Sequence, residues 1–177
     1  GSPQNVIALR RSAQSELLSQ ISREEANIIR YQPEVALRPD GKPVASGETY
    51  VIINLTKKST KDMGNISVRG VSAEGLPLRD QVSIEQGRMF TFGTQEIVVG
   101  KNIAKEFTGA SVGEQLKFGD AVWTIVGTID GRGTAFDSEI WGDVEQLLPA
   151  FGRPVFSSLT ARLSSEESFT ALKERLE

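Results

Sequence analysis

A serine between two glycines is the first candidate for chemistry in this chain. Residues 109–113 spell Gly-Ala-Ser-Val-Gly, which matches the Gly-x-Ser-x-Gly pattern of a nucleophile elbow. A serine in that motif needs a base, normally histidine, to take its proton, and the 177 residues include no histidine. The segment also lies between a predicted helix end and a predicted strand, the reverse of the strand–turn–helix order of the motif, and no Ser-x-x-Lys supplies a lysine base. Residues 109–113 are therefore predicted to form a loop of small residues.

Two glycine-containing segments carry only part of a phosphate-binding motif. Gly131 and Gly133 follow a predicted strand, but Phe136 stands at the third position of a dinucleotide fingerprint and no helical pattern follows at once. Gly100 and Lys101 lie between a strand and a helix, yet the upstream glycine of a Walker A loop is misplaced and an asparagine replaces its hydroxyl residue. Both segments are predicted to be ordinary turns, and no cofactor-binding residue is predicted.

Acidic residues gather around a tryptophan in the second half of the chain. They are Asp130, Asp137, Glu139, Asp143 and Glu145, around Trp141. Two carboxyl groups about 5–9 Å apart across a cleft can hydrolyse a glycosidic bond. One alternative is therefore a carboxylate-based hydrolase acting on cell-wall glycan, with two of Asp137, Glu139, Asp143 and Glu145. The alternating pattern of a calcium-binding EF-hand is absent. The preferred interpretation is a solvated acidic loop that, where it is functional, contacts a partner through Trp141, Glu139 and Asp143, because an exposed tryptophan is a common interface anchor.

Aromatic side chains offer a second alternative, a periplasmic ligand sensor. Such a sensor needs an enclosed pocket, here lined by Trp123, Phe136 and Trp141. The absence of cysteine and histidine removes thiol catalysis and most zinc sites. The chain is accordingly predicted to have no catalytic, cofactor-binding or metal-binding residue and not to be an enzyme.

Composition bounds the remaining classes of function. Hydrophobic residues make up 38% of the chain, which indicates a folded core. The net charge of −3 disfavours general binding of nucleic acid, which needs a basic field. No apolar run approaches the roughly 18–20 residues that span a bilayer.

Short strands and helices alternate along the chain. Strands are predicted at residues 5–10, 49–56, 65–71, 82–85, 96–100, 115–118, 121–129 and 155–163, with a hairpin around residues 39–41. A capping box at Ser22 opens a helix to about Tyr31, and a second at Ser164 opens the last helix. Further helical segments are predicted at residues 74–80, 102–107 and 141–148. The continuous apolar run at residues 51–53 predicts a strand buried on both faces.

This order of elements predicts an α+β fold in one domain, residues 3–177, with two lobes. Residues 3–60 and 140–177 would form an α/β lobe from the chain ends, and residues 61–139 a β-rich inserted lobe. No internal repeat is present.

Five segments in a fixed order carry a family resemblance. They are Ser67-Val68-Arg69-Gly70-Val71, Gly87-Arg88-Met89-Phe90, Glu96-Ile97-Val98-Val99-Gly100, Val112-Gly113-Glu114-Gln115-Leu116 and Trp123-Thr124-Ile125-Val126-Gly127. The succession resembles the periplasmic core domain of MacB/FtsX-type ABC transporter permeases, and it covers about residues 65–160. Each segment alone is weak, and their order and spacing make the resemblance specific. The fold that the resemblance implies is a porter-like α/β lobe with a β-rich insertion.

The resemblance implies a non-catalytic domain on the extracytoplasmic (periplasmic) side of the bacterial inner membrane, between two transmembrane helices of a permease. A cytoplasmic ATP-binding subunit would hydrolyse ATP, and the domain would couple that step to substrate export or to partner signalling. A periplasmic adaptor or a second permease copy would be the other partners. The family pattern also leads us to expect a further sheet element after the last helix, which the residues up to Glu177 do not contain.

Overall fold

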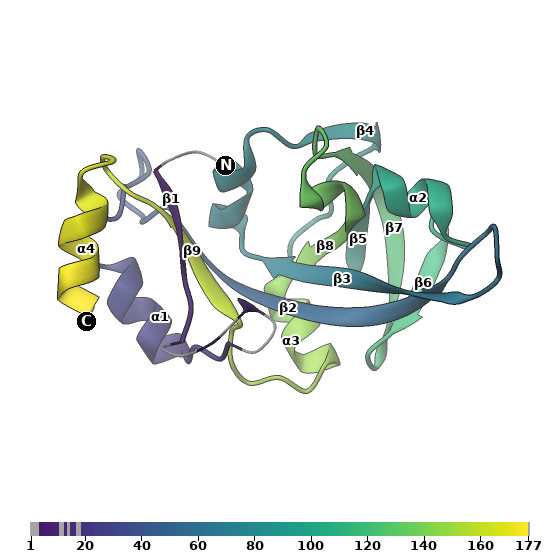
Figure 1. The fold of residues 1–177 in the computed structure, drawn as a ribbon, viewed down its shortest axis with the longest axis horizontal. Helices are drawn as coiled ribbons and strands as arrows, with labels where there is room; N and C mark the ends of the chain where they lie inside the picture. Colours follow the sequence, from purple (N-terminus) through teal and green to yellow (C-terminus); the bar gives the residue numbers. More distant parts are fainter. Residues whose placement is uncertain (1–3, 11–12, 14, 17–18, 177) are drawn as a thin grey trace.

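A single mixed sheet of nine strands forms the framework of the described chain. The computed structural model describes residues 4–10, 13, 15–16 and 19–176. The strands lie in the order β1-β9-β2-β3-β8-β5-β7-β4, with β6 paired to β7 (Figure 1). Their bounds are β1 (Asn5–Ala8), β2 (Ala45–Thr56), β3 (Met63–Val71), β4 (Ser83–Gly87), β5 (Glu96–Gly100), β6 (Gln115–Phe118), β7 (Ala121–Asp130), β8 (Glu139–Asp143) and β9 (Ser158–Arg162).

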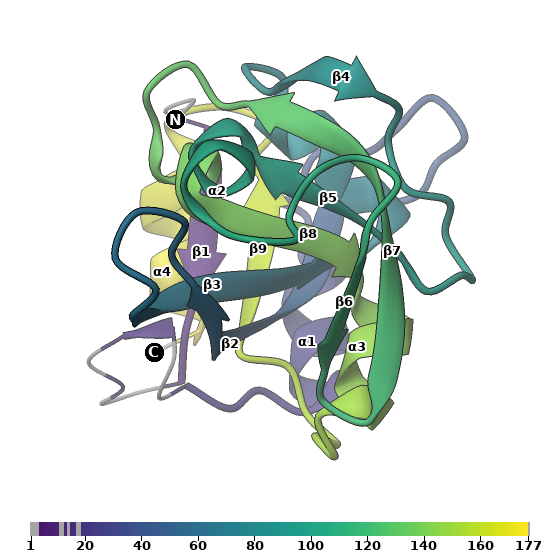
Figure 2. The same cartoon turned by 90° about the vertical axis from the view of Figure 1, so that its right-hand side faces the viewer.

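Helices lie at both ends of the sheet. They are α1 (Arg23–Arg30), α2 (Lys101–Glu106), α3 (Val144–Ala150) and α4 (Ser168–Leu176), with the 3₁₀ segments η2 (Ala73–Arg79) and η3 (Ala135–Ser138). Helices α1 and α4 lie at the end that carries β1 and β9, while α2 and the β6–β7 hairpin lie at the opposite end (Figures 1 and 2). The mixed composition of helices and strands that the sequence predicts is confirmed.

The long strand β2 connects the two ends of the molecule. Its first four residues pair with β9, and its last eight pair with β3, both antiparallel. Val51 and Ile53 point into the core, but Ile52 between them is 41% exposed. The prediction that residues 51–53 are buried on both faces is therefore wrong, because this part of β2 packs on one face only and alternates like other antiparallel strands.

Three apolar clusters make up the core. The largest lies under α2 and α3 and includes Trp123, which stacks on Phe118 with ring centroids 5.2 Å apart. The second lies between α1 and the β1-β9-β2 strands. Helix α3 contributes Leu147 to the first cluster and Leu148 to the second, so one short helix joins both. The third cluster lies on the other face of β5 and β8, around Trp141.

The two predicted capping boxes have different outcomes. Ser22 caps α1 as predicted: its hydroxyl accepts from the Glu25 backbone N–H at 3.1 Å, and its own N–H donates to the Glu25 carboxylate at 2.8 Å. The second prediction is wrong, because α4 begins at Ser168. The Ser164 N–H donates to the Glu34 carbonyl at 2.9 Å, and a bend and a turn at residues 164–167 separate it from the helix.

The segment around Trp141 is a strand followed by a helix. Strand β8 pairs parallel with β3 and antiparallel with β5, and α3 starts only after Asp143. The prediction of a helix from residue 141 is therefore wrong at its start, because strands on both sides take up the backbone groups of β8. Since β8 lies between β3 and β5, one continuous sheet runs through both predicted lobes, and the lobe boundaries near residues 60 and 140 stay a prediction.

Candidate functional site

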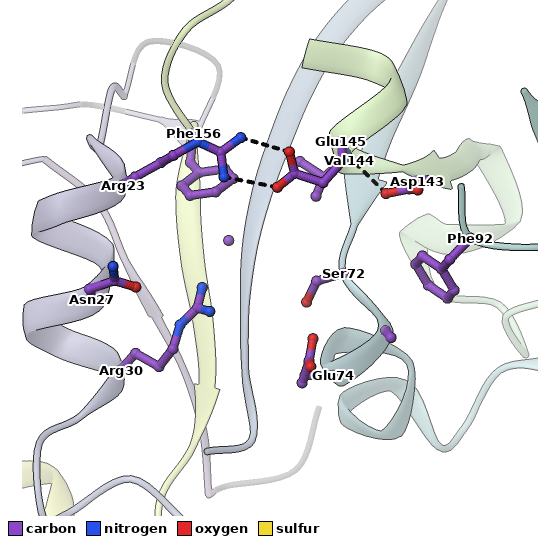
Figure 3. Close-up of a pocket in the computed structure, with 12 residues that line it drawn as sticks. Arg23, Asn27, Arg30, Ser72, Glu74, Phe92, Asp143, Val144, Glu145 and Phe156 are labelled. Carbon is purple, nitrogen blue, oxygen red and sulfur yellow. Dashed lines mark hydrogen bonds and ion pairs between the residues drawn. The ribbon is translucent and has the colours of Figure 1, made fainter. Parts of the chain in front are cut away.

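A groove of about 390 Å³ lies between α1 and the segments that carry η2 and α3. Helix α1 provides Arg23, Asn27 and Arg30 on one wall, and Ser72 and Glu74 stand on the other (Figure 3). The remaining lining comes from Gly47, Ala73, Phe92, Asp143, Val144, Glu145 and Phe156. Segments that are far apart in the sequence therefore meet at this groove.

A bidentate ion pair crosses one end of the groove. The Arg23 guanidinium donates from Nη1 and Nη2 to the two carboxylate oxygens of Glu145, at 2.9 and 2.7 Å, and lies 5.1 Å above the Phe156 ring. These hydrogen bonds lower the pKa of Glu145 and raise the pKa of Arg23. Both side chains are about half exposed, so the pair orients α1 against α3 more than it stabilises the fold.

Arg30 differs from Arg23 because it makes no close contact with a described carboxylate, although its charge also lowers the pKa of Glu145. It forms no ion pair with any residue that the structure describes, and its Nε is enclosed without a hydrogen-bond acceptor. The hydroxyl of Ser72 on the opposite wall is likewise enclosed and without a hydrogen-bond partner among the described residues. Two carboxylates of the groove are engaged: Glu145 pairs with Arg23, and Asp143 accepts from the N–H groups of Gly93 and Glu145, at 2.8 and 2.9 Å. The third, Glu74, has a contact of 3.9 Å with Arg38.

A buried cluster of charges lies on the neighbouring strands β2, β3 and β8. The Arg69 guanidinium donates to Glu139 at 2.9 and 3.1 Å, to Glu16 at 2.7 and 3.1 Å, and to Glu48 at 3.0 Å. Arg79 forms a second ion pair with Glu48, with one contact of 2.6 Å. Although burial disfavours its charge, Glu139, Glu48 and Glu16 raise the pKa of Arg69 well above its usual value.

The predicted partner contact does not have the exposure it requires. Trp141 is 1% exposed, Glu139 4% and Asp143 5%, so the expectation of an exposed tryptophan anchor is wrong. The Trp141 indole N–H donates to Glu139 at 3.0 Å, and the Arg79 guanidinium lies 5.7 Å from the indole ring. Glu139 belongs to the buried charge cluster and Trp141 packs beside it, and only Asp143 of the three lines the groove.

The other acidic candidates also have structural roles. Asp137 accepts from the backbone N–H groups of Gly131 and Gly133, at 2.6 and 2.8 Å, and fixes that loop. Asp130 pairs with Lys101 at 2.9 Å. Since Glu139, Asp143 and Glu145 are engaged as described above, each carboxylate proposed for a hydrolase is held by hydrogen bonds or an ion pair. The arrangement gives no support to a pair of carboxylates working across a cleft.

The aromatic residues proposed for a sensor pocket do not line one space. Trp123 belongs to the core cluster under α2 and α3, whereas Trp141 packs on the other face of the sheet. Phe136 packs edge-on against Trp141, with ring centroids 5.1 Å apart.

The loop predicted at residues 109–113 is present, and the Ser111 N–H donates to the Glu114 carboxylate at 3.1 Å.

The groove residues of α1 are not predicted as a site by any motif of the sequence. Arg23, Asn27 and Arg30 stand at spacings of four and three residues, which place them on one face of a helix. That spacing is a usable signal. What faces them comes from η2 and α3, which lie far away in the sequence, and nothing local indicates those partners.

The comparisons with known proteins cover nearly the whole chain. None of the curated protein sequences matches it. Among solved structures, the extracellular domain of the ABC-type transporter YknZ from Gram-positive bacteria is similar, with a TM-score of 0.67 and 15% identity over 95% of this chain and 88% of that one. The periplasmic region of MacB from Actinobacillus actinomycetemcomitans is similar with a TM-score of 0.68 and 16% identity over 99% of this chain and 83% of that one.

At such identities the structural likeness establishes the fold. Within the described residues, no helix has the length and apolar character needed to cross a membrane. The family profile, in contrast, matches the sequence itself over residues 5–177. The chain belongs to the family of MacB-like periplasmic core domains.

Proposed function

We propose that this domain transmits motion in an ABC transporter permease, without catalysis of its own. It would couple ATP hydrolysis by a cytoplasmic ATP-binding subunit to substrate export or to signalling to a partner protein. The family match over residues 5–177 carries the proposal. Membership of the family places the domain on the extracytoplasmic side of the membrane. The hydrogen bonds and ion pairs of Asp137, Glu139, Asp143 and Glu145 agree with a binding and transmitting role, since each of these four carboxylates holds a part of the fold.

The partners in this proposal are of two kinds. An ATP-binding subunit would act through the membrane-embedded part of the parent protein. A periplasmic adaptor or a second permease copy would contact the extracytoplasmic domain directly. A carboxylate hydrolase and a ligand sensor built on the aromatic residues are not favoured by any contact described above.

Site-directed labelling tests the placement of the domain. The chain contains no cysteine, so Ser59→Cys in the exposed β2–β3 loop adds one thiol to this domain. In intact cells or spheroplasts that carry the parent protein, a membrane-impermeant maleimide should label this variant. The unsubstituted parent protein is the control for other thiols. Labelling that appears only after lysis would contradict the proposed placement.

Measurements of ATP binding and of ATP-dependent transport test whether the domain couples the two. The parent transporter, reconstituted in lipid, is compared with a form whose residues 5–176 are replaced by a short flexible linker. We expect the replaced form to keep ATP binding and to lose ATP-dependent transport or partner-dependent stimulation. Transport at the unmodified rate would show that the domain does not couple the two.

A further inference from the structure

Arg30 is the arginine of the groove that forms no ion pair with a described residue. In Figure 3 the Arg30 side chain leaves α1 and extends across the groove toward Ser72 and Glu74. Its Nε and the Ser72 hydroxyl are enclosed and lack hydrogen-bond partners among the described residues, as do four other atoms elsewhere. The two Nη atoms of Arg30 are not among these enclosed atoms and form no ion pair with a described residue, so they are the donors that a ligand in the groove meets.

The charges around Arg30 restrict the chemistry of that partner. Glu145 is neutralised by Arg23, Asp143 accepts two backbone N–H groups, and Glu74 lies 3.9 Å from Arg38. An acceptor of single negative charge suits Arg30, because a guanidinium and a carboxylate form charge-assisted hydrogen bonds. A phosphate would add a second negative charge beside three carboxylates, and a free cation would be repelled by Arg30.

The shape and apolar lining favour a peptide over a small free acid. About 390 Å³ lies within the usual range of ligand pockets and is much larger than one carboxylate group. Phe92, Val144 and Phe156 provide apolar surface beside the polar groups. We propose that this groove binds an extended peptide segment of a partner protein, whose acidic side chain pairs with Arg30. The assignment rests on the proposed function only in placing that partner outside the cytoplasm.

Peptide binding to the 177-residue chain tests this assignment directly. The probes are acetyl-Leu-Glu-Leu-amide, its glutamine analogue acetyl-Leu-Gln-Leu-amide, and sodium acetate, each added to ¹⁵N-labelled protein up to about 10 mM, where weak binding is measurable. We expect amide shifts near Asn27, Arg30 and Ser72 with the glutamate peptide, and about tenfold weaker binding of the glutamine analogue. No shift with the glutamate peptide, equal affinity for the two peptides, or acetate binding as tightly as the peptide would overturn the proposal.

Three variants separate the role of Arg30 from a general charge effect. Arg30→Gln should weaken binding of the glutamate peptide by about tenfold. Arg132→Gln is the matched control, because it removes an arginine from the exposed loop after β7, and binding should be unchanged. Glu145→Gln removes a negative charge from the groove and frees Arg23, so binding should tighten. Equal weakening by Arg30→Gln and Arg132→Gln, or weaker binding by Glu145→Gln, would contradict the assignment.

The folded state of each variant is checked by its own amide spectrum. Arg30 makes no ion pair with the described residues, so its replacement by glutamine should leave the spectrum away from the groove unchanged. The binding test uses the purified domain and does not depend on membrane placement. If the peptide does not bind, the labelling experiment still tests the placement of the domain. If the labelling contradicts that placement, the peptide affinity still tests the groove.

Discussion

Arg69 is the residue on which the buried charges converge. Two arginines and three glutamates form this cluster, and the Arg69 side chain is only 7% exposed. Glu139 and Glu48 are equally enclosed, whereas Glu16 comes from the chain segment before α1 and is 16% exposed. Without Glu16 the cluster would hold two positive and two negative charges, so Arg69 is indispensable to the balance and Glu16 is not.

Replacing Arg69 by methionine should therefore destabilise the fold strongly. The change leaves Glu139 and Glu16 without their principal counterion in a buried place, which costs about 3–5 kcal/mol. The free energy of unfolding from urea denaturation measures this loss. Arg88→Met is the matched control, because Arg88 is 57% exposed in its pair with Glu96 and its loss should cost about 1 kcal/mol or less. Equal losses in the two variants would show that the buried cluster stabilises the fold no more than the exposed pair does.

The pKa of Glu96 indicates how the ion pair between Arg88 and Glu96 responds to pH. Hydrogen bonds from Arg88, together with the Thr91 N–H, lower the pKa of Glu96 from 4.5 to about 2. A pKa that is lower in the folded state gives stability that is present above about pH 4.5 and is lost as the pH falls toward 2. The difference in free energy of unfolding between the natural protein and Glu96→Gln should thus be largest at neutral pH and shrink on acidification. A difference that grows at low pH would have the wrong sign.

At the scale of elements, β7 depends on a glycine at a close backbone approach. Gly127 lies on β7 between β4 and β5, and both pairings shift register near it. A Cβ atom added at Gly127 would lie 2.0 Å from the backbone oxygen of Arg88. Since that atom belongs to the main chain, the segment that follows β4 has to move away for any side chain to fit.

Gly127→Ala should therefore cost about 3 kcal/mol or more by overpacking. Gly133→Ala is the control: an added Cβ meets nothing within 4 Å, and only the positive φ of +80° opposes it, for about 1 kcal/mol. Thermal or urea unfolding of the two variants measures the difference. A smaller loss for Gly127→Ala than for Gly133→Ala would mean that the turn after β4 moves away readily.

How far the elements follow from sequence depends on the range of their contacts. The Ser22 cap was predictable because all its partners lie within three residues. The β6–β7 hairpin was predictable for the same reason. Trp141 was misplaced because β8 is a strand only through β3 and β5, and its burial depends on Arg79 and the facing core. The groove needs α1, η2 and α3 together, so only the spacing on α1 could have indicated it.

For the whole molecule, the question is whether its two ends fold as one unit. Strand β2 belongs to both ends, since it pairs with β9 and then with β3. Helix α3 also belongs to both, through Leu147 in one cluster and Leu148 in the other. Shared strands and helices favour cooperative unfolding, in which neither end persists without the other.

Substitution of two neighbouring leucines tests whether the two ends unfold as one unit. Leu147→Ala and Leu148→Ala each leave a cavity that costs about 2–5 kcal/mol, but in different clusters. In urea, tryptophan fluorescence reports on Trp123 and Trp141 at one end, and hydrogen exchange of Ala26 and Ala161 amides reports on the other. For one cooperative unit, either variant should lower the stability reported by both probes to the same extent. If each variant affects only the probe of its own cluster, the chain folds as two lobes, and the groove between α1 and α3 lies at a flexible junction.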